Sequence, residues 1–175
     1  MVLEEQPDKK IAVIDSRSAG SELVLLVKKI CELIESGADF ETVVEKELYS
    51  RHTHVVFALS SFNNLVKNGR MSKIVGFVAN KLGFWGIGIG SEQGTIEIKQ
   101  KIRGSKKALD AIIEDMKERG YNCGKVVISH CRNAEFAESV KSAIQSVWDK
   151  AEVKIVHARG LCSYYAEKGG LIIGF

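Results

Sequence analysis

The sequence predicts an α/β protein in two parts: a parallel α/β segment, followed by an α+β segment on a mostly antiparallel sheet. Three observations lead to this prediction. Short apolar runs such as 11–14 and 55–59 alternate with segments whose apolar residues recur at helical spacing. Between 84 and 102, two strand-like runs flank a polar turn, as in a hairpin. The character of the chain changes near Arg70, so we place a boundary there, between residues 1–69 and 70–175.

The first part is expected to contain a strand, two helices, a second strand and a short helix. Ile11–Ile14 is an apolar run of the buried-strand type. Ser21 is placed to cap the first helix and Asp39 to cap the second. A buried strand at 55–59 and a short helix ending at Asn68 follow. Two strands are too few to close a core, so this part is predicted to be the remnant of a larger α/β domain.

The second part is expected to place helices on an antiparallel sheet. Ile96, Ile98 and Ile102 share one face of a strand whose other face is charged, which is typical of a half-exposed antiparallel strand. The elements are, in order, a helix capped by Ser72, strands at 84–89 and 95–102 around a turn at 91–94, a helix capped by Ser105, a strand at 126–129, a helix over 136–147, and strands at 153–156 and 171–175 joined by an irregular loop.

Composition excludes several classes of function. With 45% hydrophobic and 27% charged residues, the 175-residue chain has an ordinary globular composition. A net charge of +3 is too small to argue for nucleic acid. No apolar run approaches the roughly 20 residues of a membrane helix, so we expect no integral membrane protein. The four cysteines lack metal-ligand spacing, and we expect them to be reduced, in a cytoplasmic protein.

The sequence offers no catalytic motif in a suitable context. Gly86-x-Gly88-x-Gly90 resembles a nucleotide-binding loop, but a strand follows where that loop needs a helix. We therefore interpret these glycines as tight packing or a bulge within a strand. The Ser, His and Asp residues form no nucleophile elbow, so hydrolase chemistry has no support.

Basic residues gather around the second arm of the hairpin and the helix after it; they are Lys99, Lys101, Arg103, Lys106 and Lys107. Solvated charge on an exposed strand accounts for most of them. Lys106 and Lys107, however, fall in the first turn of a helix, where the helix dipole disfavours cations. A phosphate or an acidic protein surface would offset this, and Arg103 and Lys106 are the candidates to bind it.

The segment Asn64–Lys73 resembles the Leu-x-x-Gly-Gly-Arg-Ile-Ser signature of the DegV family of bacterial fatty-acid-binding proteins. Three more pieces match the family in order: Ile11–Ser16 a mid-chain strand, Gly37–Phe40 a helix junction, and Lys101–Ala108 an Arg-Gly-x-Lys-Lys-Ala element. Val127–His130 resembles the strand that follows. The resemblance covers essentially the whole chain, yet it corresponds only to the carboxy-terminal portion of the family.

The resemblance implies a lipid-binding protein that is not itself an enzyme and carries no cofactor. In the family, a long-chain fatty acid such as palmitate or stearate lies between two domains and is presented to a separate fatty acid kinase subunit. Transfer of the implied roles gives a ligand site of Ser16, Arg70, Ser72, Phe77, Ser163, Tyr164 and Tyr165, with Arg103 and Lys106 facing the kinase or a phosphate. Transient membrane contact is compatible with such a role.

Two of these residues have plainer explanations. Ser16 ends the predicted strand at 11–14, where ligands of α/β proteins often bind, but local capping of a turn explains it as well. Phe77 lies on the apolar face of a predicted helix, and such residues are more often core than the lining of an acyl tunnel.

The chain also departs from the family. The family's chief carboxylate donors, a Thr and a Ser of the amino-terminal half, have no counterpart here, and that half is expected to be missing. The family's Gly-x-His-x-Gly-Pro-Gly loop corresponds to 163–170, where Tyr165 replaces the His and Lys168 the Pro. A phenol donates a hydrogen bond as a neutral imidazole does, but it does not become a cation.

Two other classes of function stay open. The chain could be a protein-interaction or regulatory module without a complete pocket, dimerising to cover Ile11–Ile14. It could also be a small-molecule phosphotransfer enzyme that uses the basic cluster, although the sequence shows neither a phosphate loop nor a carboxylate pair.

Overall fold

The computed structural model describes residues 5–6, 8–49, 53–70, 83–91 and 95–175. Its helices are α2 (Ser21–Glu35), α3 (Phe40–Tyr49), α4 (Asn63–Lys67), α6 (Ser105–Glu118), α7 (Ala134–Val147) and α8 (Gly160–Ala166). Its strands are β1 (Val55–Leu59), β2 (Phe84–Gly90), β3 (Ile96–Arg103), β4 (Lys125–His130), β5 (Glu152–His157) and β6 (Leu171–Gly174). The helix predicted from Ser72, together with Phe77, lies outside the described residues.

The strands form one mixed sheet in the order β3-β2-β1-β6-β4-β5. Only β4 and β5 pair in parallel, and the other pairs are antiparallel. The predicted α/β class with a mostly antiparallel sheet is therefore confirmed. The parallel pairing expected of the first part does not occur at β1, which lies antiparallel between β2 and β6. The boundary at residue 70 stays a prediction, with β1 joined across it to strands of the second part.

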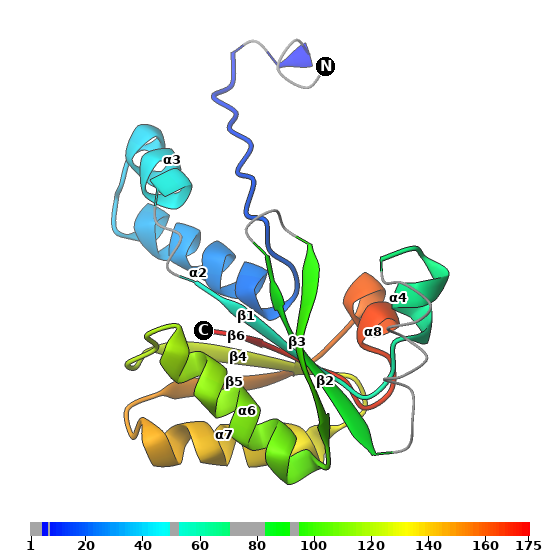
Figure 1. Ribbon diagram of the computed structural model, residues 1–175. Helices are drawn as coiled ribbons and strands as arrows, with labels where there is room; N and C mark the ends of the chain where they lie inside the picture. The colour runs from blue at the N-terminus through cyan, green and yellow to red at the C-terminus, as the bar shows by residue number, and fades with distance from the viewer. Residues whose placement is uncertain (1–4, 7, 50–52, 71–82, 92–94) are drawn as a thin grey trace.

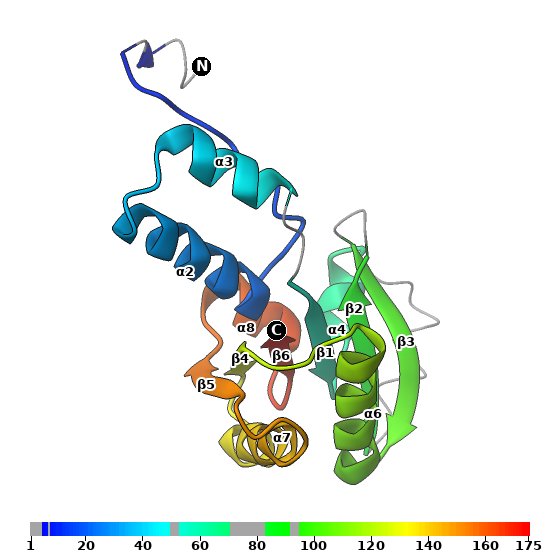
Figure 2. The same ribbon diagram turned by 90° about the vertical axis from the view of Figure 1, so that its left-hand side faces the viewer.

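Helices cover the two faces of the sheet unequally (Figures 1 and 2). Helices α6 and α7 lie on one face, and α2 lies across β4 and β6 on the other. Helices α4 and α8 contact each other at one end of the sheet, and α3 contacts α2 away from it. As a result, the helices of the described ranges leave much of the face of β1, β2 and β3 opposite α6 uncovered.

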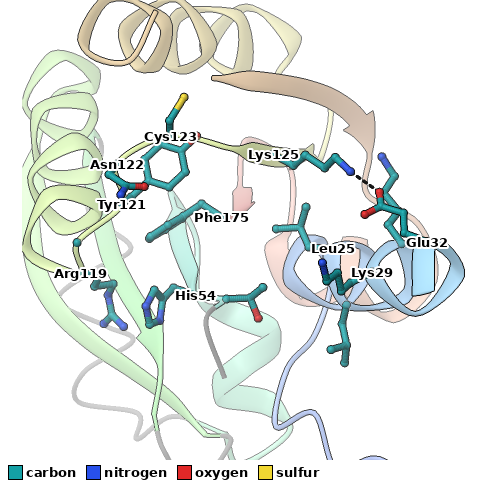
Figure 3. Close-up of a pocket in the computed structure, with 14 residues that line it drawn as sticks. Leu25, Lys29, Glu32, His54, Arg119, Tyr121, Asn122, Cys123, Lys125 and Phe175 are labelled. Carbon is teal, nitrogen blue, oxygen red and sulfur yellow. Dashed lines mark hydrogen bonds and ion pairs between the residues drawn. The ribbon is translucent and has the colours of Figure 1, made fainter. Parts of the chain in front are cut away.

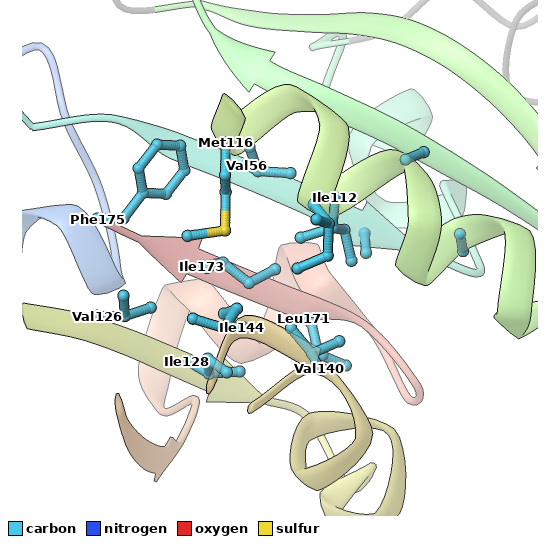
Figure 4. Close-up of a cluster of buried hydrophobic side chains, with 14 of the residues drawn as sticks. Val56, Ile112, Met116, Val126, Ile128, Val140, Ile144, Leu171, Ile173 and Phe175 are labelled. Atoms are coloured by element: carbon cyan, nitrogen blue, oxygen red, sulfur yellow. The ribbon is translucent and has the colours of Figure 1, made fainter. Parts of the chain in front are cut away.

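The main core lies between the sheet and helices α6 and α7 (Figure 4). Alternate residues of the strands point into it, among them Val56, Ile128 and Ile173, and they meet Ile112 of α6 and Ile144 of α7. All five are fully or almost fully buried. Burial of an aliphatic side chain of this size contributes about 2 kcal/mol, so this layer holds the sheet and the two helices together.

The predicted strand at 11–14 is wrong. These residues make no strand among the described part of the chain, and Val13 is 88% exposed. The segment instead extends away from the sheet (Figure 1). Its apolar composition predicted burial, but no strand of the described sheet lies beside it to supply hydrogen bonds.

Two predicted helix caps are also wrong, and one is confirmed. Helices α2 and α6 begin at Ser21 and Ser105, but neither serine caps its helix. The Ser21 hydroxyl is buried and bonds to Ser129 Oγ at 2.7 Å and to the Ile172 carbonyl at 2.6 Å. Ser21 thus fastens α2 to β4 and β6. Asp39 does cap α3, since its carboxylate accepts from the Thr42 amide at 2.8 Å.

The predicted irregular loop between the last two strands contains helix α8. This helix carries Ser163, Tyr164 and Tyr165, which therefore point in different directions. It is short, and its residues, Gly-Leu-Cys-Ser-Tyr-Tyr-Ala, show no regular apolar stripe. Helical periodicity could not reveal it.

Candidate functional site

An apolar groove lies on the thinly covered face of the sheet. Strand β1 supplies its floor because its residues alternate: Val56 and Ala58 enter the main core, while Val55, Phe57 and Leu59 face the groove. The other apolar lining residues are Leu65 of α4, Ile96 of β3, Leu161, Cys162 and Ala166 of α8, and Ile172 of β6. The cavity has a volume of about 180 Å³.

Glycines of β2 shape this face. Gly86, Gly88 and Gly90 alternate with Ile87 and Ile89, which are buried in the main core. A methyl group at Gly86 would lie 2.1 Å from Cζ of Phe62, so the glycine leaves room for that buried ring. The register of β2 against β3 shifts between Ile87 and Gly88. Tight packing and a bulge, as predicted for these glycines, are therefore confirmed.

Polar groups stand at the rim of the groove. Arg70 Nε donates to the Tyr165 hydroxyl at 3.0 Å, and the guanidinium lies 5.1 Å from the centre of the tyrosine ring. Ser18 also lines the groove, and its buried hydroxyl makes no hydrogen bond of ordinary geometry within the described residues. It does act on Glu22, where it offsets part of the rise in pKa that burial causes.

The structure brings together some of the predicted site residues and separates others. Arg70 and Tyr165 both line the groove. Tyr164 points away, is 43% exposed and accepts a hydrogen bond from Asn68 at 2.9 Å. Ser163 faces a different cavity beside His130. Ser16 lies next to the groove, where its hydroxyl accepts from the Ser18 amide at 3.3 Å. Ser72 lies outside the described residues, as Phe77 does.

Arg103 and Lys106 are exposed at the end of β3 and the start of α6. Their predicted role toward a kinase or phosphate stays a prediction.

Sequence reasoning missed Ser18, Cys162 and Ile172 as groove residues. No local signal marks them, because they come from three distant parts of the chain; Ile172, for example, meets the groove through the pairing of β6 with β1.

A second cavity, of about 520 Å³, lies between α2 and the turn that joins α6 to β4 (Figure 3). Leu25, Tyr121 and Phe175 form its apolar side, and several lysines and Arg119 border it. Burial, with a smaller contribution from Cys123, raises the pKa of Tyr121 to about 12, so its phenol stays neutral and donates to the Gly124 carbonyl at 3.0 Å. Lys125 is already paired with Glu32, and Arg119 with Asp115. These two cations are therefore engaged within the protein.

The described residues contain neither a metal-binding cluster nor a membrane-spanning helix. No three His, Cys, Asp or Glu side chains gather there where they could hold a metal ion. No helix in the described ranges is both long and apolar enough to cross a membrane.

The fold and the groove define an α/β protein with an apolar groove over β1 and polar side chains at its rim. The model of the DegV family, described as uncharacterised proteins, matches residues 1–175, and the chain belongs to this family. A DegV domain-containing protein of Streptococcus pneumoniae R6 is 44% identical over 174 residues, which are 99% of this chain and 62% of the relative. One from Streptococcus gordonii is 40% identical over 176 residues, 63% of its length.

Solved structures give the same family and fold. The Fatty Acid Kinase (Fak) B3 protein of Streptococcus pneumoniae, loaded with linoleic acid, matches with a TM-score of 0.95 and 44% identity. A DegV family protein of Eubacterium eligens, loaded with heptadecanoic acid, matches with a TM-score of 0.94 and 37% identity. The match covers 99% of this chain in both cases, and 62% and 63% of the two relatives. The chain thus spans less than two thirds of the relatives' length.

Proposed function

We propose that the chain binds a long-chain fatty acid, with the acyl chain in the groove over β1 and the carboxylate at the Arg70–Tyr165 rim. The observation that carries the proposal is the combination of an apolar floor with one guanidinium and one phenol at its edge. Each methylene removed from water contributes roughly 0.8 kcal/mol, which favours an acyl chain over a short acid. The linoleic and heptadecanoic acids in related structures support this choice.

The carboxylate needs hydrogen-bond donors and a countercharge, because its unpaired burial is costly. Arg70 already points at the Tyr165 hydroxyl, and a carboxylate beside the pair would accept from both groups. The Ser18 hydroxyl is a further polar group on the same groove. Tyr165 therefore fills the donor role that the resemblance assigns to a histidine, without any change of charge near neutral pH.

Gas chromatography of a solvent extract of the purified chain tests the proposal. We expect about one long-chain fatty acid per chain. Ile96→Glu places a charge in the groove and should abolish retention, whereas Val147→Glu, at a 46% exposed position on α7, should leave it intact. An extract without fatty acid, or equal retention in the two variants with unchanged circular dichroism, would refute the proposal.

We further propose that the bound carboxylate is presented to a fatty acid kinase subunit through Arg103 and Lys106. Both side chains are exposed and extend the positive charge of β3 into the first turn of α6. In a coupled assay with the kinase, Arg103→Gln should lower acyl phosphate formation while fatty acid retention stays normal. The charge-matched control is Lys154→Gln on β5, at the opposite edge of the sheet. Equal kinase rates in both variants would refute this step.

A second candidate function is an interaction module, and the outer face of α2 favours it. Val27 and Ile34 are 52% and 60% exposed there, and Val13 is exposed in the preceding segment. Such a face is typical of a surface that another protein covers. Light scattering after size-exclusion chromatography tests whether this face binds a second copy of the chain. A dimer that Val27→Lys dissociates supports self-association, and a monomer excludes self-association.

A further inference from the structure

A separate cavity, of about 480 Å³, lies at the carboxyl ends of β4 and β5. Its lining residues are His130, Cys131, Arg132, His157, Ala158, Ser163 and Lys168, none of which lines the groove. The two strands pair in parallel and end opposite each other at His130 and His157, whose rings lie 4.5 Å apart. Ends of neighbouring parallel strands are where α/β sheets commonly bind ligands.

Hydrogen bonds fix the cavity wall. Nδ1 of His130 accepts from the Asn133 backbone amide at 3.1 Å, so the neutral ring carries its proton on Nε2. The Asn133 side chain donates to the Gly169 carbonyl at 2.7 Å. The Cys131 amide donates to the Gly170 carbonyl, and the Gly169 amide donates to the Cys131 carbonyl. These backbone hydrogen bonds hold the turn before β6 and place Lys168 beside the end of β4. His130 is 4% exposed, and it lines the cavity.

The charges around the cavity are of one sign. Arg132 and Lys168 are exposed, and neither makes an ion pair with any residue that the structure describes. No carboxylate is among the lining residues. Glu167, the nearest acid in sequence to Lys168, is turned to Ser61 at 2.6 Å and to the Asn64 amide at 2.7 Å. Burial, together with the charge of His157, lowers the pKa of His130, which keeps it a neutral donor.

This combination suits an oxyanion better than a metal ion. Two imidazoles could bind a metal, but two unpaired cations beside them would repel it. Cys131 also lines the cavity, yet its thiol is turned to the Ser163 carbonyl at 3.7 Å, and no three His, Cys, Asp or Glu side chains of the described ranges are placed to hold a metal ion. A tetrahedral oxyanion would accept from Nε2 of His130 and from both cations, whereas the Ser163 hydroxyl already donates to the Gly160 carbonyl at 2.8 Å.

We propose that the cavity is a binding site for a phosphate group, either inorganic phosphate or the phosphate of a small phosphomonoester. The site is built on the opposite side of α8 from the groove, since Cys162 and Tyr165 face the groove and Ser163 faces this cavity. It is independent of the fatty acid proposal, and either can fail alone.

Nitrogen-detected NMR of the histidine rings tests the site. Sodium phosphate is titrated into the chain at about pH 7.5 and constant ionic strength, with sodium chloride as the balancing salt. We expect saturable shifts at His130 and His157. Lys168→Gln and Arg132→Gln should each weaken binding about tenfold, because each removes one charge-assisted contact. Lys150→Gln, which removes an exposed charge outside the cavity, should bind like the unaltered chain.

A parallel titration with glycerol 3-phosphate distinguishes the two sources of phosphate. Tighter binding of the ester identifies a phosphomonoester site, and equal binding identifies a site for the phosphate group alone. Shifts that do not saturate, or the same weakening in Lys150→Gln as in Lys168→Gln, would overturn the proposal. Unchanged amide spectra of each variant confirm that it is folded.

Discussion

At the scale of single residues, the contact between Gly86 and Phe62 leaves no room for a side chain. A methyl group at Gly86 would overlap Cζ of Phe62, which is fully buried and cannot move into solvent. We expect Gly86→Ala to lower the free energy of unfolding by about 2 kcal/mol in urea denaturation. Gly90→Ala is the matched control, since its methyl group would meet a single Val55 methyl at 3.0 Å. Equal midpoints for the two variants would contradict this account.

We expect protonation of His130 to make the free energy of unfolding depend on pH in the mildly acidic range. Burial, and less strongly His157, lowers its pKa from 6.5 in the folded protein, so the unfolded chain binds the proton more readily. The contribution of neutral His130 to the free energy of unfolding is therefore fully present above about pH 6.5, and it is lost as the pH falls through the pKa of the folded protein. In urea titrations, His130→Gln should flatten this decline, whereas His157→Gln should keep most of it. A decline unchanged in His130→Gln would show that other groups cause it.

At this scale the sequence predicted only some of the residues that line the groove. Arg70 and Tyr165 came from a family motif, and the structure places them in contact. The partners of Ser21 and Ile172 could not be predicted, because their contacts depend on how β6 lies beside β1 and β4. Non-local pairing of this kind leaves no periodicity in the chain.

At the scale of elements, Asp115 links the edge strand β3 to helix α6. Its carboxylate is 5% exposed and lies 2.7 Å from Arg119 Nε and 3.3 Å from Lys99 Nζ. Without the carboxylate, Arg119, which is 19% exposed, loses its ion pair, while Lys99 keeps Glu118, so Asp115→Ala should cost about 3 kcal/mol of unfolding free energy. Glu118→Ala removes a 59% exposed partner of the same lysine and should cost under about 1 kcal/mol. Similar costs would show that burial of Asp115 does not matter.

Helices and strands were predicted correctly where their apolar residues recur at a regular spacing. Helices with a clear apolar stripe, such as α6 and α7, and the alternating strand β3 were all predicted. Helix α8 was missed because its seven residues carry no stripe, and 11–14 was mistaken for a strand because an apolar run does not reveal whether a neighbouring strand is present.

At the scale of the whole molecule, removal of the ligand should lower thermal stability. A molecule that binds only the folded chain stabilises it by mass action, about 2.7 kcal/mol at one hundred times the dissociation constant. For a chain of this size we expect palmitate to raise the melting temperature of delipidated protein by roughly 5–10 °C in calorimetry. Methyl palmitate, which has no charge, should raise it less. Equal shifts would mean that the rim residues do not recognise the carboxylate.

Strand β6 has a consequence for how the molecule folds. It lies between β1 and β4, and it alone connects the ladder β3-β2-β1 to the ladder β4-β5. The second edge of β1 is therefore paired only when β6 is in place, with Ile173 opposite Val56. Because β1 and β6 are far apart in the sequence, this pairing is expected to form slowly. Until then two half-sheets expose open edges, and the groove lacks the Ile172 wall that β6 supplies. Refolding should show the groove appearing last, together with the joining of the two ladders.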